Sequence, residues 1–356
     1  MLYPQVRLNH KIFDNDVPQV PIRKGFGEGL LAAGEADPRV VGLCADLTES
    51  TQMHLFKNKF PERFVEIGVA EQNLVTVASG MAAMGKIPFV SSYAMFSPGR
   101  NWEQIRTTIC YNDRPVKIAG SHAGVSVGPD GGTHQAIEDI ALMRVLSRMV
   151  VISPCDAIEA RKATIAAAKT NTPVYIRLAR EKTPIITTEE TPFEIGKAQV
   201  FFEPRIHADG NADKRGFEIS VNQRGNQRSS ASVGIVATGA LVYKAILAAR
   251  ELWEKEKIGA AVLNLSTIKP IDEKALVKLA RECGAIVTVE EHQVAGGMGS
   301  AVAEVLVRTV PVPIEFVGVT DQFGQSGKPE ELLEHYGLGV SHIKAAAKKV
   351  LGRKNA

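Results

Sequence analysis

One carboxylate, Glu71, stands where a strand-like run (residues 64–67) passes into a helix-like run. The apolar residues Leu74, Ala78 and Met81 follow it at helical spacing and form one buried stripe. Glu71 is therefore expected at the mouth of a helix, and we expect the chemistry there. A carboxylate at this position would also stabilise the positive end of the helix by ~0.3–1 kcal/mol without any catalytic role.

A second polar cluster lies downstream. It consists of His122 and the string Asp130-Gly131-Gly132-Thr133-His134, a glycine-rich loop between a strand-like run (116–119) and a helical stretch (136–144). Two such clusters at the ends of strands are hard to explain by packing alone.

The elements that must position these residues follow an α/β pattern. Short apolar, β-rich runs alternate with amphipathic or alanine-rich segments, which favours parallel sheets covered by helices. We predict an α/β protein with two doubly wound domains and mainly parallel sheets. Strands are expected at 40–44, 87–92, 116–119, 149–153, 174–178, 233–237, 260–265, 285–290 and 314–319. The predicted units are an extension (1–20), a first domain (21–195), a polar linker or insertion (196–231) and a second domain (232–356).

Composition limits the classes of function. The 356 residues are 45% hydrophobic and 23% charged, as in ordinary globular proteins. The 42 basic and 39 acidic residues give a net charge of only +3, so neither a nucleic-acid partner nor a basic membrane-binding face is expected. The four cysteines are far apart and show no metal-ligand spacing. No apolar run reaches membrane-spanning length and no signal peptide is recognisable, so a cytoplasmic protein is expected.

Five strings in fixed order carry a family resemblance across most of the chain. They are Arg23, Ala45-Asp46-Leu47-Thr48, Gly68-Val69-Ala70-Glu71, Asp130-Gly131-Gly132-Thr133-His134-Gln135 and Thr288-Val289-Glu290-Glu291-His292. In this order the chain resembles the carboxyl-terminal half of transketolases. The resemblance implies a domain that holds the pyrimidine ring of thiamine diphosphate, followed by the family's carboxyl-terminal domain. Glu290-Glu291-His292 is expected to order an interface loop.

The resemblance also implies a cofactor site. Glu71 would hydrogen-bond the ring nitrogen N1′ and favour the imino tautomer, whose exocyclic nitrogen is the base that forms the carbanion at C2. Phe96 would stack on the pyrimidine, while Asp46 and Trp102 would lie near the cofactor. Packing in the core is an equal alternative for Tyr93 and Trp102. Capping of a turn or helix is the alternative for Asp46.

Substrate contacts are implied by the same resemblance. Asp130 and His134 would contact hydroxyl groups near the reacting carbons, with His134 counted with Glu71 among the catalytic residues. The terminal phosphate of a sugar phosphate would be held by Arg23, Ser50, His122 and Arg180, since a guanidinium fork suits phosphate. The presence of His122 favours a transketolase over a deoxyxylulose phosphate synthase.

One half of the expected enzyme is missing. The family binds the diphosphate and Mg²⁺ through a Gly-Asp-Gly string, and none occurs in this sequence. The chain therefore looks like one subunit of a split transketolase, inactive alone, whose partner supplies the Mg²⁺ ligands in a heterotetramer of two plus two chains. The alternatives are a β-type subunit of a 2-oxo acid dehydrogenase, a relative of deoxyxylulose phosphate synthase, and a non-catalytic regulatory subunit.

Overall fold

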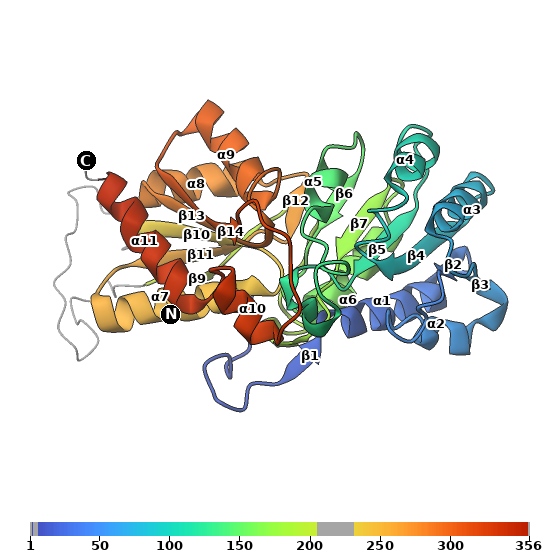
Figure 1. The fold of residues 1–356 in the computed structure, drawn as a ribbon, viewed down its shortest axis with the longest axis horizontal. Helices are drawn as coiled ribbons and strands as arrows, with labels where there is room; N and C mark the ends of the chain where they lie inside the picture. Colours follow the sequence, from blue (N-terminus) through green and yellow to red (C-terminus); the bar gives the residue numbers. More distant parts are fainter. Residues whose placement is uncertain (1, 3–5, 205–230, 355–356) are drawn as a thin grey trace.

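The computed structural model describes residues 2, 6–204 and 231–354. Within them the chain forms two large sheets, the first mainly from the first half of the sequence and the second from the second half (Figure 1). A small antiparallel pair, β1 (Gln19–Pro21) with β8 (Lys182–Pro184), lies beside the first sheet.

The first sheet has seven strands in the order β12-β6-β7-β5-β4-β2-β3. All neighbours are parallel except β12, which pairs antiparallel with β6. The strands are β2 (Val40–Cys44), β3 (Phe64–Glu66), β4 (Ile87–Tyr93), β5 (Lys117–Ser121), β6 (Val150–Ile152), β7 (Val174–Arg177) and β12 (Thr267–Lys269). Because β12 comes from the second half of the chain, the two halves are joined through this sheet.

Helices cover both faces of the first sheet, so its strands are apolar on both sides. In β2, Val40 and Val41 are both buried but belong to different core clusters. One face carries α1 (Ile22–Ala36), α2 (His54–Lys59) and α6 (Ala157–Ala168). The other carries α3 (Glu71–Ala83), the π-helical turn η3 (Ile105–Cys110), which follows α4 (Trp102–Gln104), and α5 (Asp139–Arg144).

The second sheet has five strands in the order β14-β13-β10-β11-β9, with only β9 antiparallel. The strands are β9 (Gln199–Phe202), β10 (Val233–Ala237), β11 (Ala260–Asn264), β13 (Ile286–Gln293) and β14 (Ile314–Val319). Helices α7 (Leu241–Glu256) and α11 (Val340–Lys354) pack on one face. Helices α8 (Glu273–Cys283) and α9 (Met298–Thr309) pack on the other, in a core continuous with that of the first sheet.

The predicted α/β fold with two mainly parallel sheets is confirmed. The helix expected at 136–144 begins only at Asp139, and β13 continues through Glu290-Glu291-His292 to Gln293. The stretch 196–231 was expected as a linker, yet its first part forms the edge strand β9. Residues 205–230 of that stretch lie outside the described residues, and the domain division stays a prediction.

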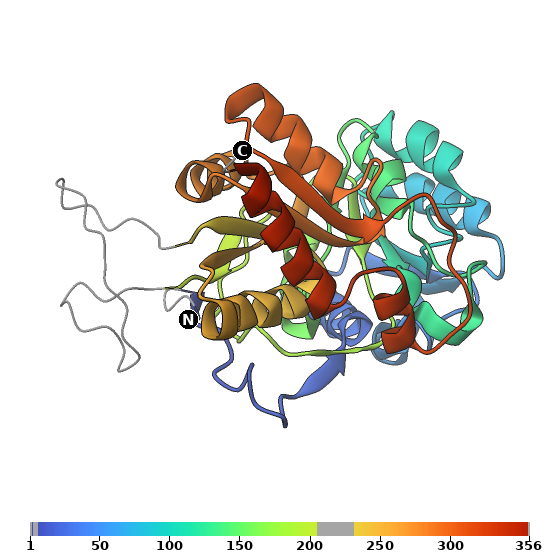
Figure 2. The same cartoon turned by 60° about the vertical axis from the view of Figure 1, so that its left-hand side comes forward.

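The second half of the chain reaches back over the first. The segment before α10 (Pro329–His335) crosses between the halves, and α10 packs on the 3-10 turn η4 (Val125–Asp130) (Figures 1 and 2). Another 3-10 turn, η2 (Pro61–Arg63), leads into β3. Because α10 packs on η4, the loop with the second polar cluster is held between the two halves.

A buried glutamate at this junction makes stability depend on pH. Glu159 of α6 accepts hydrogen bonds from the Cys155 N–H (2.7 Å) and the Asn264 amide at the end of β11 (2.8 Å). Burial, the largest effect, raises the pKa of Glu159 from 4.5 to about 7. The folded state therefore binds a proton more tightly than the unfolded state, and stability present below pH 4.5 is lost as pH rises through about 7.

We expect Glu159 to lower the free energy of unfolding by on the order of 3 kcal/mol between those pH values. Urea denaturation of wild type and Glu159→Gln at several pH values measures this. The variant should lack the part of the pH dependence of the unfolding free energy that Glu159 contributes. Glu103→Gln, an exposed change, should keep it. If the unfolding free energies of wild type and Glu159→Gln changed in parallel with pH, the raised pKa of Glu159 would be contradicted.

Candidate active site

The carboxyl ends of the parallel strands gather at one edge of the first sheet. Strand β3 lies beside β2 on one side, and the chain then crosses to place β4 on the other side of β2. Such a reversal of strand order opens a crevice outside the carboxyl ends of the strands. The predicted residues follow these ends: Asp46 after β2, Glu71 after β3, Phe96 after β4, His122 after β5 and Arg180 after β7.

Glu71 is the first residue of α3 and is 2% exposed. Its Oε1 accepts from the Ser92 hydroxyl (3.2 Å) and its Oε2 from Nη1 of Arg100 (2.7 Å). The Asn101 amide donates to the backbone carbonyl of Glu71 (2.9 Å) and so fixes the helix start. A buried carboxylate with both oxygens bound to polar partners is held in one orientation.

Aromatic rings form a wall beside Glu71. The ring of Tyr93 stacks on His122 (centroids 3.9 Å apart) and lies 6.3 Å from Phe96 in a nearly parallel orientation. His134 stands edge-on to Phe96 at 5.4 Å, and its Nδ1 lies 2.9 Å from the Thr133 hydroxyl. The structure thus brings Phe96, His122 and His134 together around Tyr93. A buried carboxylate next to an aromatic face suits a flat nitrogen heterocycle such as an aminopyrimidine.

Arg23 and His122 are in direct contact. Nη1 of Arg23 lies 2.9 Å from Nε2 of His122 and also donates to the Ser50 carbonyl (3.1 Å). A guanidinium only donates, so Nε2 accepts and Nδ1 of His122 carries the proton, which it donates to Ser121 Oγ at 2.9 Å. Burial, with the Arg23 and Arg180 cations, lowers the pKa of His122 to about 3. His122 is therefore neutral at neutral pH.

A second arginine joins this cluster. Arg180 donates to the Val127 carbonyl and lies 3.7 Å from the Asp130 carboxylate. Burial, and then the charge of Arg180, lower the pKa of Arg23. Among the described residues, the buried Nε of Arg23 has no hydrogen-bond partner. A buried donor without an acceptor is costly, and an anionic ligand would satisfy it.

The carboxyl-terminal half holds the glycine-rich loop in shape. Glu291 of β13 accepts from the Ser126 N–H (2.5 Å), and a Cβ added at Gly124 (φ +92°) would lie 2.3 Å from the Glu291 carboxylate. The Gln135 amide donates to the Val125 carbonyl (2.9 Å) and the Gln325 carbonyl (3.0 Å). Glu291 therefore orders a loop at the junction of the two halves.

Three predicted residues have contacts other than those that were predicted. Asp46 is exposed in the left-handed region (φ +56°), with its N–H donating to Glu66. Ser50 meets Arg23 through its backbone carbonyl rather than its hydroxyl. The Trp102 indole donates to the Leu142 carbonyl (2.8 Å), and Trp102 therefore packs on α5. Their roles at the cofactor and substrate stay predictions.

Sequence reasoning missed the partners of Glu71. Ser92 and Arg100 lie 21 and 29 residues from Glu71 along the chain and reach it only through the parallel arrangement of β3 and β4 around β2. Glu66 was also missed. Its carboxylate accepts from the N–H groups of Asp46 (2.7 Å) and Gly68 (3.0 Å) and so joins the loops after β2 and β3. The only sequence signal was that Ser92 closes an apolar strand run.

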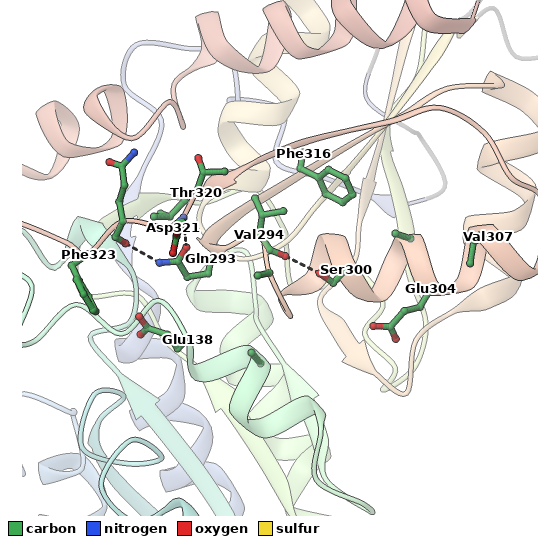
Figure 3. Close-up of a pocket in the computed structure, with 15 residues that line it drawn as sticks. Glu138, Gln293, Val294, Ser300, Glu304, Val307, Phe316, Thr320, Asp321 and Phe323 are labelled. Carbon is green, nitrogen blue, oxygen red and sulfur yellow. Dashed lines mark hydrogen bonds between the residues drawn. The ribbon is translucent and has the colours of Figure 1, made fainter.

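A separate groove of about 1000 Å³ lies where the two halves meet (Figure 3). Its lining includes the apolar residues Val307, Phe316 and Phe323 and the acidic residues Glu138, Glu304 and Asp321. The lining residues include no arginine, lysine or histidine and none of the predicted site residues. We place the chemistry at the carboxyl ends of the strands of the first sheet, because the described residues there join a buried carboxylate, aromatic rings and cations, and the groove has no cation in its lining.

The described part of the chain has neither a cluster of metal ligands nor a membrane-spanning helix. It contains no group of three or more His, Cys, Asp or Glu side chains placed to hold a metal ion. It also contains no helix with the length and apolar character needed to cross a membrane.

Comparison with known proteins decides the family. Residues 18–185 match the model of the transketolase pyrimidine-binding domain, and residues 225–343 match that of the transketolase C-terminal domain. The chain belongs to the transketolase family. Its place within that family is the carboxyl-terminal section, since it is 40% identical to a transketolase C-terminal section of Methanocaldococcus jannaschii over 93% of this chain and 95% of the relative.

Two further comparisons show how much of a transketolase this chain covers. The chain is 34% identical to the transketolase of Rattus norvegicus over 96% of its own length but only 50% of that protein. It also resembles a solved structure described as a split-gene transketolase, an inactive β4 tetramer, with a TM-score of 0.81 and 43% identity over 94% of this chain and 99% of that one. The chain thus has the extent of half-length members of the family.

Proposed function

We propose that this chain is one subunit of a split transketolase. Together with a diphosphate-binding partner subunit, it would transfer a two-carbon ketol unit from a ketose phosphate to an aldose phosphate, with thiamine diphosphate as cofactor. The observation that carries the proposal is the buried Glu71 carboxylate beside Phe96, in the same crevice as the Arg23, His122 and Arg180 cluster. The match to half-length relatives supports the split arrangement.

Glu71 and the aromatic wall would hold the cofactor's pyrimidine ring. When bound, thiamine diphosphate supplies a carbanion at its thiazolium C2. Glu71, oriented by Ser92 and by the start of α3, would hydrogen-bond N1′ and hold a proton there. Phe96 would provide the stacking face, and the exposed Asp46 would line the edge of the site.

The remaining cluster would bind and orient the sugar. His134 and Asp130 would contact hydroxyl groups near the reacting carbons, and His134 would move a proton at a substrate oxygen. Arg23, with its unpartnered Nε, and Arg180 would hold the terminal phosphate, assisted by His122 and Ser50. Neutral His122 accepts from Arg23 and donates to Ser121, so its part would be to orient the Arg23 guanidinium toward the phosphate.

The partner subunit would complete the site. It would provide the diphosphate site and the Mg²⁺ ligands, and two copies of each chain would form the assembly. The solved relative described as an inactive β4 tetramer supports the expectation that this half is inactive alone.

The test is a ketol-transfer assay on the protein assembled with its partner, thiamine diphosphate and Mg²⁺. Transfer from a ketose phosphate to an aldose phosphate is expected. Turnover of pyruvate or another 2-oxo acid instead would favour the 2-oxo acid dehydrogenase or deoxyxylulose phosphate synthase reading. No turnover of either, in an assembly that binds no cofactor, would favour a regulatory subunit.

Arg180→Met should weaken binding of phosphorylated substrates selectively. Losing a charge-assisted contact to the phosphate is expected to raise KM for the ketose phosphate by about 10- to 100-fold, with little change in kcat. A ketol donor without phosphate is the internal control, because its kcat/KM should be unchanged. An equal loss with both donors would contradict the phosphate role of Arg180.

A further inference from the structure

Arg100 occupies the two contacts that the proposed pyrimidine site needs. Its Nη1 lies 2.7 Å from Oε2 of Glu71, and its guanidinium carbon lies 4.9 Å from the centroid of the Phe96 ring. The guanidinium is a flat cation that donates hydrogen bonds and stacks on aromatic faces. It thus presents to Glu71 and Phe96 the same chemistry as a flat heterocycle with an N–H donor.

The side chain of Arg100 can leave while its backbone stays. The side chain is 48% exposed, whereas that of Glu71 is 2% exposed. The backbone is fixed, because the Arg100 N–H donates to the Phe96 carbonyl (3.0 Å) and the Asn101 amide donates to Ser97 Oγ (3.2 Å). Release of Arg100 therefore requires loss of its contacts with Glu71 and Phe96 and rotation of a half-exposed side chain into water, but no movement of the backbone.

Leaving Glu71 without a cation would be costly in the cofactor-free protein. Among the described residues, its other oxygen has only the neutral Ser92 hydroxyl as partner. A carboxylate buried to this extent needs a charged or strongly donating partner. Arg100 supplies one, but a ring that stacks on Phe96 and donates to Glu71 must displace it from both contacts.

We propose that Arg100 is a positioning residue that occupies the pyrimidine subsite until the cofactor binds. It holds Glu71 and Phe96 in place, and the aminopyrimidine ring displaces it. The inference rests on the proposed function, because the displacing ligand is thiamine diphosphate. Arg100 competes with the cofactor for Glu71, so cofactor binding exchanges one partner of Glu71 for another.

The test is calorimetric titration of thiamine diphosphate, with Mg²⁺, into the cofactor-free assembly of this chain with its partner. Arg100→Gln should bind the cofactor about tenfold more tightly than wild type, because no ion pair or cation–π contact has to be broken first. The cofactor-free variant should also have a lower Tm than wild type. Arg100→Lys keeps the charge without the flat fork and should fall between the two.

Arg106→Gln removes an exposed arginine of η3 and serves as the matched control, with unchanged affinity and Tm. Equal or weaker cofactor binding by Arg100→Gln, when wild type binds, would overturn the role of Arg100 and leave the proposed function standing. Absence of binding by wild type and Arg100→Gln alike would contradict the proposed function itself, and this inference with it.

Discussion

Replacing Glu71 by glutamine is expected to lower kcat of the assembled enzyme by about 10²–10⁴-fold. Glutamine keeps the shape of the side chain and its contact with Ser92, but it cannot hold the proton that the carboxyl group shares with the cofactor ring. Steady-state ketol transfer with saturating cofactor measures the effect.

The matched control is Glu103→Gln, which removes an exposed carboxylate from α4 and should leave kcat unchanged. Because Arg100 can turn into solvent, Glu71→Gln should keep a melting temperature close to that of wild type. Normal turnover by a folded, cofactor-loaded Glu71→Gln assembly would remove Glu71 from the mechanism.

Arg177→Met should be the most destabilising single change at the junction. Nε of Arg177 lies 2.9 Å from the Asp139 carboxylate, and both side chains are almost fully buried. Arg177 also donates to the backbone carbonyls of Ala136 (3.2 Å) and Glu291 (2.8 Å). Its loss leaves a buried carboxylate without its cation, so the free energy of unfolding should fall by about 3–5 kcal/mol in urea denaturation.

An exposed pair provides the comparison. Arg308→Met breaks the ion pair with Glu273 on the surface and should cost no more than about 1 kcal/mol. In a double-mutant cycle, Arg177→Met with Asp139→Asn should lose less than the sum of the single losses, because no unpaired charge remains. Strict additivity would show that the buried pair is not coupled.

The elements of this fold are predictable because local patterns determine them. Strands β2, β10 and β14 have the bounds expected from their apolar runs. In β2 and β10 every residue is buried, and burial on both faces of a parallel sheet selects such runs. Glu71 begins its helix as the spacing of the apolar residues after it indicates. The edge strand β9 was missed because an edge strand of four residues in a polar region carries little periodic signal.

The contacts of the site depend on packing between distant residues. Glu291 and Ser126 are 165 residues apart, and Arg23 and His122 are 99 apart. No local spacing predicts such pairs, because the first joins the two halves of the chain and the second joins the start of α1 to the loop after β5. Arg100 is the clearest case, since an arginine in an exposed loop usually reads as a solvated surface residue.

The central claim is that this chain holds one half of a thiamine diphosphate site that a partner subunit completes. Native mass spectrometry of the protein, purified gently from its own source, tests this directly. The expected mass is that of a complex with a companion chain in equal number, carrying thiamine diphosphate and Mg²⁺. A complex with a companion chain that still binds no thiamine diphosphate when both cofactors are supplied would contradict the claim.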